Sequence, residues 1–141
     1  MIKNLLTVGS QVQRWTYPIY GVDPRNNQQC LLGSCIPLKL SQHVVLLTAS
    51  HVFRLNKYTT LYLGVEDAGL PLSGSVYGND SLDFSFTLLP GDIASQMAGL
   101  PLLTVEYVDV EDLQGRDTIH AFMGFPKTRN KLGDCRQFQP S

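Results

Sequence analysis

The sequence predicts an all-β domain, either a barrel or a sandwich, and two observations carry this prediction. Seven or so short apolar runs recur along the chain, with clusters of Gly, Pro, Asn and Asp between them, as is typical of short strands joined by turns. Helical periodicity is poor nearly everywhere, and only residues 93–100 fit one short helical turn. A length of 141 residues fits one domain, and 43% hydrophobic residues are enough for a core.

The clearest strands form one predicted hairpin. An apolar run over residues 30–40 is followed by a short polar turn and by a second apolar run from Val44, so the two runs are expected to pair. Residues 7–20 are expected to be a leading segment or an edge strand, because Pro18 cannot donate a hydrogen bond to a neighbouring strand. The other expected strands cover residues 59–65, 81–89, 105–110 and 118–125, and a loop is expected over residues 69–80.

The strand expected over residues 81–89 shows the period of two that a half-buried strand requires. Its apolar positions are Leu82, Phe84, Phe86 and Leu88, and its polar positions are Asp83, Ser85 and Thr87. The aromatic residues of the chain are most simply core or barrel-rim side chains; they include Trp15, Tyr17, Tyr62, Phe84 and Phe86.

Charge and composition narrow the class of partner. Lys and Arg number 11 against 12 Asp and Glu, so a net charge of -1 gives no electrostatic reason to expect nucleic acid or an anionic membrane. No apolar run approaches the roughly 20 residues that span a bilayer, and residues 1–10 lack the pattern of a signal peptide. Three cysteines without an export signal predict reduced thiols and a cytoplasmic protein. Cys30 and Cys35 fall on one expected strand, too far apart for a bridge.

The best candidate for chemistry is His51. It follows the apolar run that begins at Val44, where the chain changes to small and hydroxylated residues, so a strand would deliver its ring to the edge of a sheet. Asp83 begins another expected strand and could accept a hydrogen bond from one ring nitrogen of His51, which leaves the other nitrogen free as a general base. A single His and a single Asp in a β-domain are more often solvated or structural, and the two residues alone leave that alternative open.

Four segments together resemble trypsin-like serine proteases of the bacterial type. Residues 47–51, Leu-Thr-Ala-Ser-His, resemble the Leu-Thr-Ala-Ala-His segment around the catalytic histidine of that family, and residues 33–36 resemble the strand that packs beside it. Residues 82–89 resemble the Asp-hydrophobic-Ala strand that carries the catalytic aspartate. Residues 121–126, Ala-Phe-Met-Gly-Phe-Pro, resemble the Gly-Tyr-Pro segment that opens the second barrel.

The resemblance implies a fold and a set of roles. Residues 1–90 would form a six-stranded antiparallel Greek-key barrel, residues 91–116 a linker, and residues 117–141 the start of an incomplete second barrel. His51 would be the general base and Asp83 the carboxylate that orients it. The activity implied is hydrolysis of peptide bonds in a protein or peptide substrate by acyl transfer, with no cofactor and no metal.

The chain also departs from the family pattern. It contains no Gly-Asp-Ser-Gly-Gly turn, which in the family supplies the serine nucleophile and the oxyanion donors. The chain is therefore expected to be inactive alone, with the missing half supplied by a longer parent or by a second chain. The alternative is a pseudo-protease, a non-catalytic β-barrel used for protein binding or regulation. Val52 stands where animal members have a disulfide-forming cysteine, which fits an intracellular or bacterial-type member.

Two weaker candidates remain. Residues 133–135, Gly-Asp-Cys, resemble the Gly-Asp-Cys-Gly nucleophile turn of viral chymotrypsin-like cysteine proteases, which makes Cys135 a weak candidate nucleophile, but Arg136 follows where a glycine is expected. A zinc site could draw on His43, His51 and His120 with a cysteine. Their spacings match no short-range ligand pattern, so no metal is expected.

Overall fold

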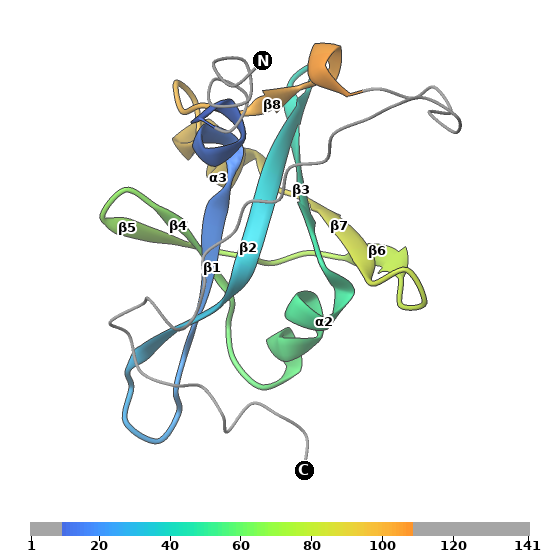
Figure 1. Cartoon of the computed structure of the whole chain (residues 1–141). Coiled ribbons are helices and arrows are strands. Elements are labelled where there is room, and N and C mark those ends of the chain that lie inside the picture. Colours follow the sequence, from blue (N-terminus) through green and yellow to red (C-terminus); the bar gives the residue numbers. More distant parts are fainter. Residues whose placement is uncertain (1–9, 109–141) are drawn as a thin grey trace.

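The structure, a computed structural model, describes residues 10–108, and antiparallel β-strands are the main regular structure among them (Figure 1). Residues 10–15 are helical. The elements that follow are β1 (Tyr17–Val22), β2 (Gln29–Leu40), β3 (His43–Thr48), α2 (Ser50–Phe53), the 3₁₀ helix η1 (Arg54–Lys57), β4 (Tyr62–Val65), β5 (Ala68–Pro71), β6 (Val76–Asn79), β7 (Phe84–Leu88), α3 (Gly91–Gln96), β8 (Leu103–Thr104) and the 3₁₀ helix η2 (Val105–Tyr107). The predicted all-β class is confirmed.

The strands hydrogen-bond in the order β5-β4-β1-β2-β3-β7-β6, and the short β8 pairs in parallel with β2. The two strands at the ends of this path, β5 and β6, follow one another in the chain, with residues 72–75 between them. The backbone N–H of Leu72 donates to the carbonyl of Leu61 at 2.8 Å, just before β4. The Thr87 hydroxyl of β7 donates to the carbonyl of Ser75 at 2.8 Å. The connection between β5 and β6 is thus bonded to both ends of the path.

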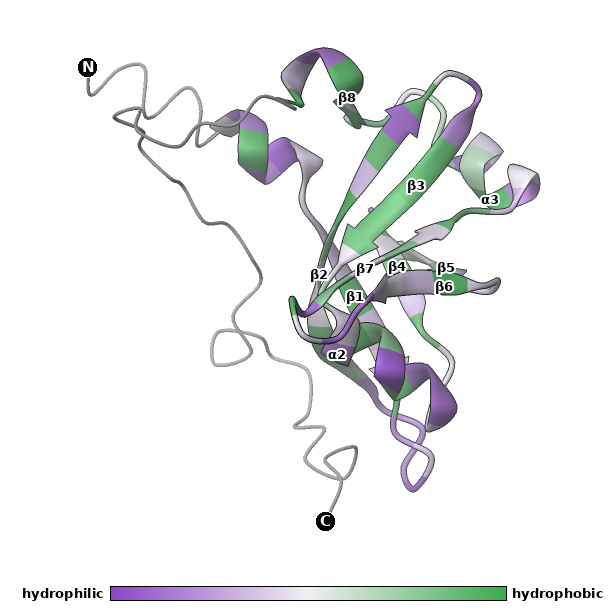
Figure 2. Ribbon diagram, turned by 90° about the vertical axis from the view of Figure 1, so that its right-hand side faces the viewer, coloured by the Kyte–Doolittle hydropathy of each residue, from purple (hydrophilic) through white to green (hydrophobic). Residues whose placement is uncertain are grey.

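The hydrophobic core collects side chains from both halves of this path. Figure 2 shows β3 as largely hydrophobic, and its inward side chains are buried in the alternating pattern of a strand. α2 and α3 close the core from outside the sheet. The buried core residues are Ile19, Cys30, Leu32, Cys35, Val44, Leu46, Val52, Phe53, Leu61, Leu63, Val65, Leu70, Leu72, Leu89, Ile93 and Met97.

Several expected strands are confirmed and others are wrong. The β2–β3 hairpin forms as predicted, with Leu40 opposite His43. β1 is not an edge strand, because it pairs with β2 on one side and with β4 on the other. Pro18 is tolerated there because β4 pairs only with Ile19 and Tyr20, so no β4 carbonyl needs an N–H at Pro18.

The stretch expected to be a loop, residues 69–80, contains most of β5 and all of β6. Its glycines and prolines mark strand ends and a close approach between backbones, which is why the composition resembled that of a loop. The described part of the expected strand over residues 105–110 begins as a 3₁₀ helix instead. The expected strand over residues 118–125 lies outside the described residues.

The domain boundaries of the prediction are only partly covered by the described residues. β1 to β7 lie within residues 1–90. Of the expected linker over residues 91–116, the described part forms α3 and then returns to the sheet through β8, where Leu103 lies opposite Leu38 of β2. Residues 117–141 lie outside the described range.

The cysteines differ from the prediction. Cys35 is a free, buried thiol, and burial raises its pKa far above the ordinary value. Cys30 is disulfide-bonded, so the expectation of three reduced thiols is wrong. The two cysteines are not bridged to each other, as predicted from their place on β2. Within residues 10–108, no helix is long and apolar enough to cross a membrane.

Candidate active site

His51 is delivered by the end of β3. The last residue of that strand, Thr48, donates its hydroxyl to the Ser34 carbonyl of β2 at 2.6 Å, and the chain then turns into α2 (Figure 1). Val52 and Phe53 are buried, with 3% and 6% of their surface exposed, and anchor this short helix on the core. Any side chain in place of Gly33 would collide with Val52, because a Cβ there would lie 2.7 Å from Cγ2 of that valine. The buried side of α2 thereby fixes the opposite side, which carries the His51 ring.

Asp83 is delivered by the turn between β6 and β7. The turn is held by the Leu82 N–H, which donates to Oδ1 of Asn79 at 3.1 Å, and by the Asp83 N–H, which donates to the Asp80 carbonyl at 3.2 Å. Asp83 itself has φ of 50°, in the left-handed region that aspartate tolerates better than most residues. This conformation aims the carboxylate at α2 rather than along β7.

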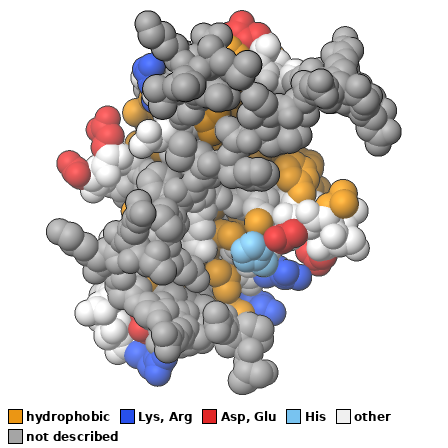
Figure 3. Space-filling view, in the orientation of Figure 1, with side chains coloured by type: hydrophobic (Ala, Val, Ile, Leu, Met, Phe, Trp, Pro, Cys, Tyr) orange, Lys and Arg blue, Asp and Glu red, His pale blue; other side chains and the backbone are white. Residues whose placement is uncertain are grey.

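The carboxylate of Asp83 receives two hydrogen bonds from His51. Nδ1 of the ring lies 2.6 Å from Oδ2, and the backbone N–H donates to Oδ1 at 3.0 Å. A carboxylate at neutral pH only accepts, so the proton of a neutral ring is assigned to Nδ1 and Nε2 carries the free lone pair. The side chains are 59% and 46% exposed respectively. Figure 3 shows a histidine at the surface with acidic, basic and apolar side chains close by.

The contacts with His51 also set the electrostatics of the pair. The backbone N–H of His51 lowers the pKa of Asp83 most, and the side-chain hydrogen bond to the ring adds to this effect. Charges on His51 and Arg54 lower the pKa further, while partial desolvation opposes them. Asp83 is therefore ionised at neutral pH and keeps its role as hydrogen-bond acceptor.

Sequence reasoning missed an exposed apolar row beside this pair. In β7, Ser85 and Thr87 point inward, with 4% and 2% exposed, whereas Phe84, Phe86 and Leu88 are exposed by 46%, 37% and 50%. The expected alternation is present, and of the two places expected for Phe84 and Phe86, core or barrel rim, their exposure rules out the core. The Phe86 ring lies 5.6 Å from that of Tyr77 and 6.5 Å from that of Phe84, between centroids. Leu82, 75% exposed, continues the row toward Asp83.

The other candidate ligands and nucleophiles do not join this pair in the part of the chain that is described. His43 begins β3 and His51 follows its other end, so the strand separates them. No group of three or more potential metal-ligating side chains occurs among residues 10–108. Cys135 and His120 lie outside the described residues. Nε2 of His51 makes no hydrogen bond with any described residue.

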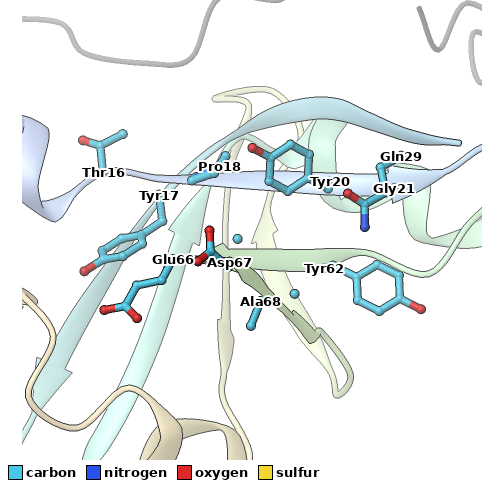
Figure 4. Close-up of a pocket in the computed structure, with 12 residues that line it drawn as sticks. Thr16, Tyr17, Pro18, Tyr20, Gly21, Gln29, Tyr62, Glu66, Asp67 and Ala68 are labelled. Atoms are coloured by element: carbon cyan, nitrogen blue, oxygen red, sulfur yellow. The ribbon is translucent and has the colours of Figure 1, made fainter. Parts of the chain in front are cut away.

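A separate hollow lies on the β1–β4–β5 side of the sheet and has a volume of about 430 Å³. Figure 4 shows Tyr20 and Tyr62 at this hollow, with Asp67 near the middle of the view and the Glu66 carboxylate beside Tyr17. Gly64 is required under it, because a Cβ there would lie 2.6 Å from the Tyr20 ring. Its lining includes neither His51 nor Asp83, so the hollow is separate from the candidate pair.

Comparison of the chain with protein-family models, with curated proteins and with solved structures finds no match in any of the three. The geometry of His51 and Asp83 is therefore the basis on which a function can be assigned.

Proposed function

We propose that the chain carries the base-and-orienter part of a trypsin-like serine endopeptidase, with His51 as general base and Asp83 as the carboxylate that orients it. The observation that carries the proposal is the double contact of Asp83 with Nδ1 and the backbone N–H of His51, at 2.6 and 3.0 Å. This contact fixes the ring in the tautomer and direction that a general base requires, and it leaves Nε2 available to accept a proton.

In the proposed reaction, Nε2 of His51 accepts the proton of a serine hydroxyl as that oxygen attacks the peptide carbonyl of a protein or peptide substrate. The imidazolium that forms is stabilised by the Asp83 carboxylate, and its proton then passes to the leaving amine. No described residue donates to or accepts from Nε2. In this proposal, the serine and the oxyanion donors come from a longer parent chain or from a second chain, because the sequence has no Gly-Asp-Ser-Gly-Gly turn.

We also propose that β1 to β7 form one closed six-stranded Greek-key barrel, in which β5 and β6 are two halves of a single bent strand. In support, β5 pairs with β4 at one end of the path and β6 pairs with β7 at the other. The bonds at Leu72 and Ser75 link the connection between the two halves to both sides. Closure would leave no open sheet edge at this point.

The exposed apolar row of β7 supports the expectation that further protein packs beside the pair. Exposed rings next to one another are unusual on a surface that only meets water. A covering layer there would also bury His51 and Asp83, strengthen their interaction and exclude water from the reaction. In this proposal, that layer is the part that brings the serine.

The second candidate function is a pseudo-protease that binds or regulates a protein. The same apolar row favours it, since such a row can serve a binding partner without any chemistry.

The cytoplasmic location expected from the cysteine count stays a prediction. The disulfide at Cys30 is the observation against it, because structural disulfides are rare in reducing compartments.

Labelling with a fluorophosphonate probe tests the proposal on the protein as expressed from its natural gene. We expect a serine to react in the wild type and to stop reacting in His51→Ala, whereas His43→Ala, which removes a histidine outside the pair, still reacts. No labelling of a folded protein would contradict the proposal and favour the pseudo-protease. Stoichiometric iodoacetamide labelling of Cys135 that is lost in His51→Ala would point to a cysteine protease instead.

A further inference from the structure

Two buried hydroxyls meet directly behind the candidate pair. Ser50 precedes His51 in the chain, and Ser85 follows Asp83 by two positions on β7. Their side chains are buried, with 2% and 4% of the residue surface exposed, and the two Oγ atoms lie 2.5 Å apart. Ser50, next to His51 in the chain, is therefore hydrogen-bonded to Ser85, which lies two residues after Asp83.

The direction of the hydrogen bonds follows from their third member. Oγ of Ser50 also lies 3.4 Å from the carbonyl of Asn79, the last residue of β6. A carbonyl can only accept, so Ser50 donates to Asn79, and Ser85 in turn donates to Ser50. Both buried hydroxyl protons have an acceptor in this order, as buried polar groups require.

This chain of hydroxyls continues into the turn that presents Asp83. The side chain of Asn79 accepts the N–H of Leu82 at 3.1 Å, while its carbonyl accepts from Ser50. Asn79 thus ties the start of α2 to the turn immediately before Asp83. We call Ser85, Ser50 and Asn79 the hydroxyl chain.

Gly78 allows the hydroxyl chain to form. A Cβ at this position would collide with Oγ of Ser85 and with the carbonyl oxygen of Phe84. The β6 backbone therefore lies directly against Ser85, and this close approach keeps the Asn79 carbonyl within reach of Ser50. The need for glycine here is steric, because Gly78 has no positive φ.

We propose that the hydroxyl chain is a positioning device that sets the place of His51 relative to Asp83. α2 is not part of the sheet, so no strand pairing fixes its first turn to β7 or to the turn before it. The His51–Asp83 contact is itself about half exposed and open to competition from water. Ser50 and Ser85 make the buried, water-protected link between the same two elements. They do not touch a reacting atom, so their effect on the reaction acts through His51.

The consequence for turnover rests on the proposed function, but the positioning can be tested without any reaction. The first readout is the exchange rate of the His51 backbone amide hydrogen, followed by NMR in the 141-residue chain, because this N–H donates to Asp83. The second is the pKa of Asp83, followed by the chemical shift of its carboxyl carbon. The variants are Ser50→Ala, Ser85→Ala and the double variant.

Thr87→Val is the matched control. Thr87 is on the same face of β7 as Ser85, is 2% exposed, and donates its hydroxyl to Ser75, away from His51. The control therefore removes an equally buried hydroxyl bond from the same strand. A general loss of stability would affect Thr87→Val as much as the serine variants.

In Ser50→Ala, which removes both links, we expect the His51 amide to exchange about tenfold faster or more, the factor that corresponds to about 1.4 kcal/mol. The pKa of Asp83 should rise toward its ordinary value. Ser85→Ala should show a smaller change, since Ser50 keeps its bond to Asn79. The double variant should match Ser50→Ala, because the two hydroxyls act as a unit.

An exchange rate in Ser50→Ala no faster than in Thr87→Val would overturn the proposal, as would an unchanged pKa of Asp83. These outcomes are separate from those of the fluorophosphonate experiment. Faster exchange in a protein without a reactive serine would leave the positioning intact and reject the endopeptidase. A reactive serine whose labelling rate is the same in wild type and Ser50→Ala would keep the endopeptidase and reject the positioning.

Discussion

β3 and β7 are paired neighbours that together deliver the candidate site, yet they bury opposite kinds of side chain. β3 buries its apolar residues Val44 and Leu46 and follows the usual pattern of a sheet that covers a core. β7 buries the hydroxyls of Ser85 and Thr87 and exposes its apolar residues. The two strands run antiparallel in one register, with Leu46 opposite Thr87, so the difference is not a matter of pairing.

The difference shows two ways of fixing a strand in place. Apolar burial holds β3 and is not directional, whereas β7 is held by hydrogen bonds that require particular partners at particular distances. A directional bond suits the strand that must aim Asp83, and it leaves the apolar side of β7 available to another surface. Burial of β3 thus contributes mainly to stability, whereas the hydrogen bonds of β7 determine where Asp83 lies.

The largest effect should come from truncating a buried apolar side chain of β3. Leu46→Ala, at a position with 0% exposure, should destabilise the fold by about 2–5 kcal/mol, since it removes core contacts and leaves a cavity. Leu88→Ala is the matched control on β7, where the leucine is 50% exposed, and should cost less than about 1 kcal/mol. Urea denaturation followed by circular dichroism measures both. Equal losses would mean that β7 contributes to the core as β3 does.

A second change tests the close approach that the hydroxyls of β7 need. Gly78→Ala should destabilise by about 1–3 kcal/mol, because the new Cβ meets backbone and side-chain atoms of β7 that must shift. Gly91→Ala is the control, since a Cβ there meets nothing within 4 Å. Thermal unfolding of both variants gives the comparison. Retention of wild-type stability in Gly78→Ala would show that β6 and β7 are less tightly apposed than the structure has them.

A smaller effect should follow on the exposed side of β7. Phe86→Ser loses ring contacts with Tyr77 and Phe84 at a position that is 37% exposed, so we expect a loss of about 1–2 kcal/mol, less than for Leu46→Ala. The variant should at the same time bind less of a hydrophobic dye than the wild type, because the exposed row is interrupted. Unchanged dye binding would show that Phe86 is not part of an accessible apolar surface.

Much of this fold could be predicted from the sequence because its signals are local. The period of two along residues 81–89 and the two apolar runs around the hairpin correctly indicated strands. What period alone cannot give is which face of a strand turns inward, and for β7 the hydrophobic rule chose the wrong one. The buried hydroxyls of Ser85 and Thr87 have partners on α2 and before β6, and such long-range bonds leave no trace in the local pattern.

The candidate site was predicted more fully than the strands that carry it. His51 and Asp83 were expected to meet, and the structure brings them within 2.6 Å. The role of Ser50 and Ser85 was not expected, although both stand where the resembled motifs have alanine. A departure from a motif at one position says little, and only the fold reveals that the two departures are bonded to each other.

The smallest effect should be the contribution of Asp83 to stability, because it and His51 are about half exposed. The bonds from His51 hold the folded-state pKa of Asp83 below its ordinary value of 3.8, so the unfolded chain binds this proton more tightly than the folded one. The contribution of Asp83 to stability is therefore fully present above the ordinary pKa of 3.8 and is lost as the pH falls from there through the lower folded pKa.

Stability measured from pH 7 downward should fall more steeply in the wild type than in Asp83→Asn, which has no carboxyl to titrate. If stability depends on pH in the same way in the wild type and in Asp83→Asn, His51 does not bind the carboxylate in solution. The hydrogen bonds of β7 would then not position Asp83 for His51.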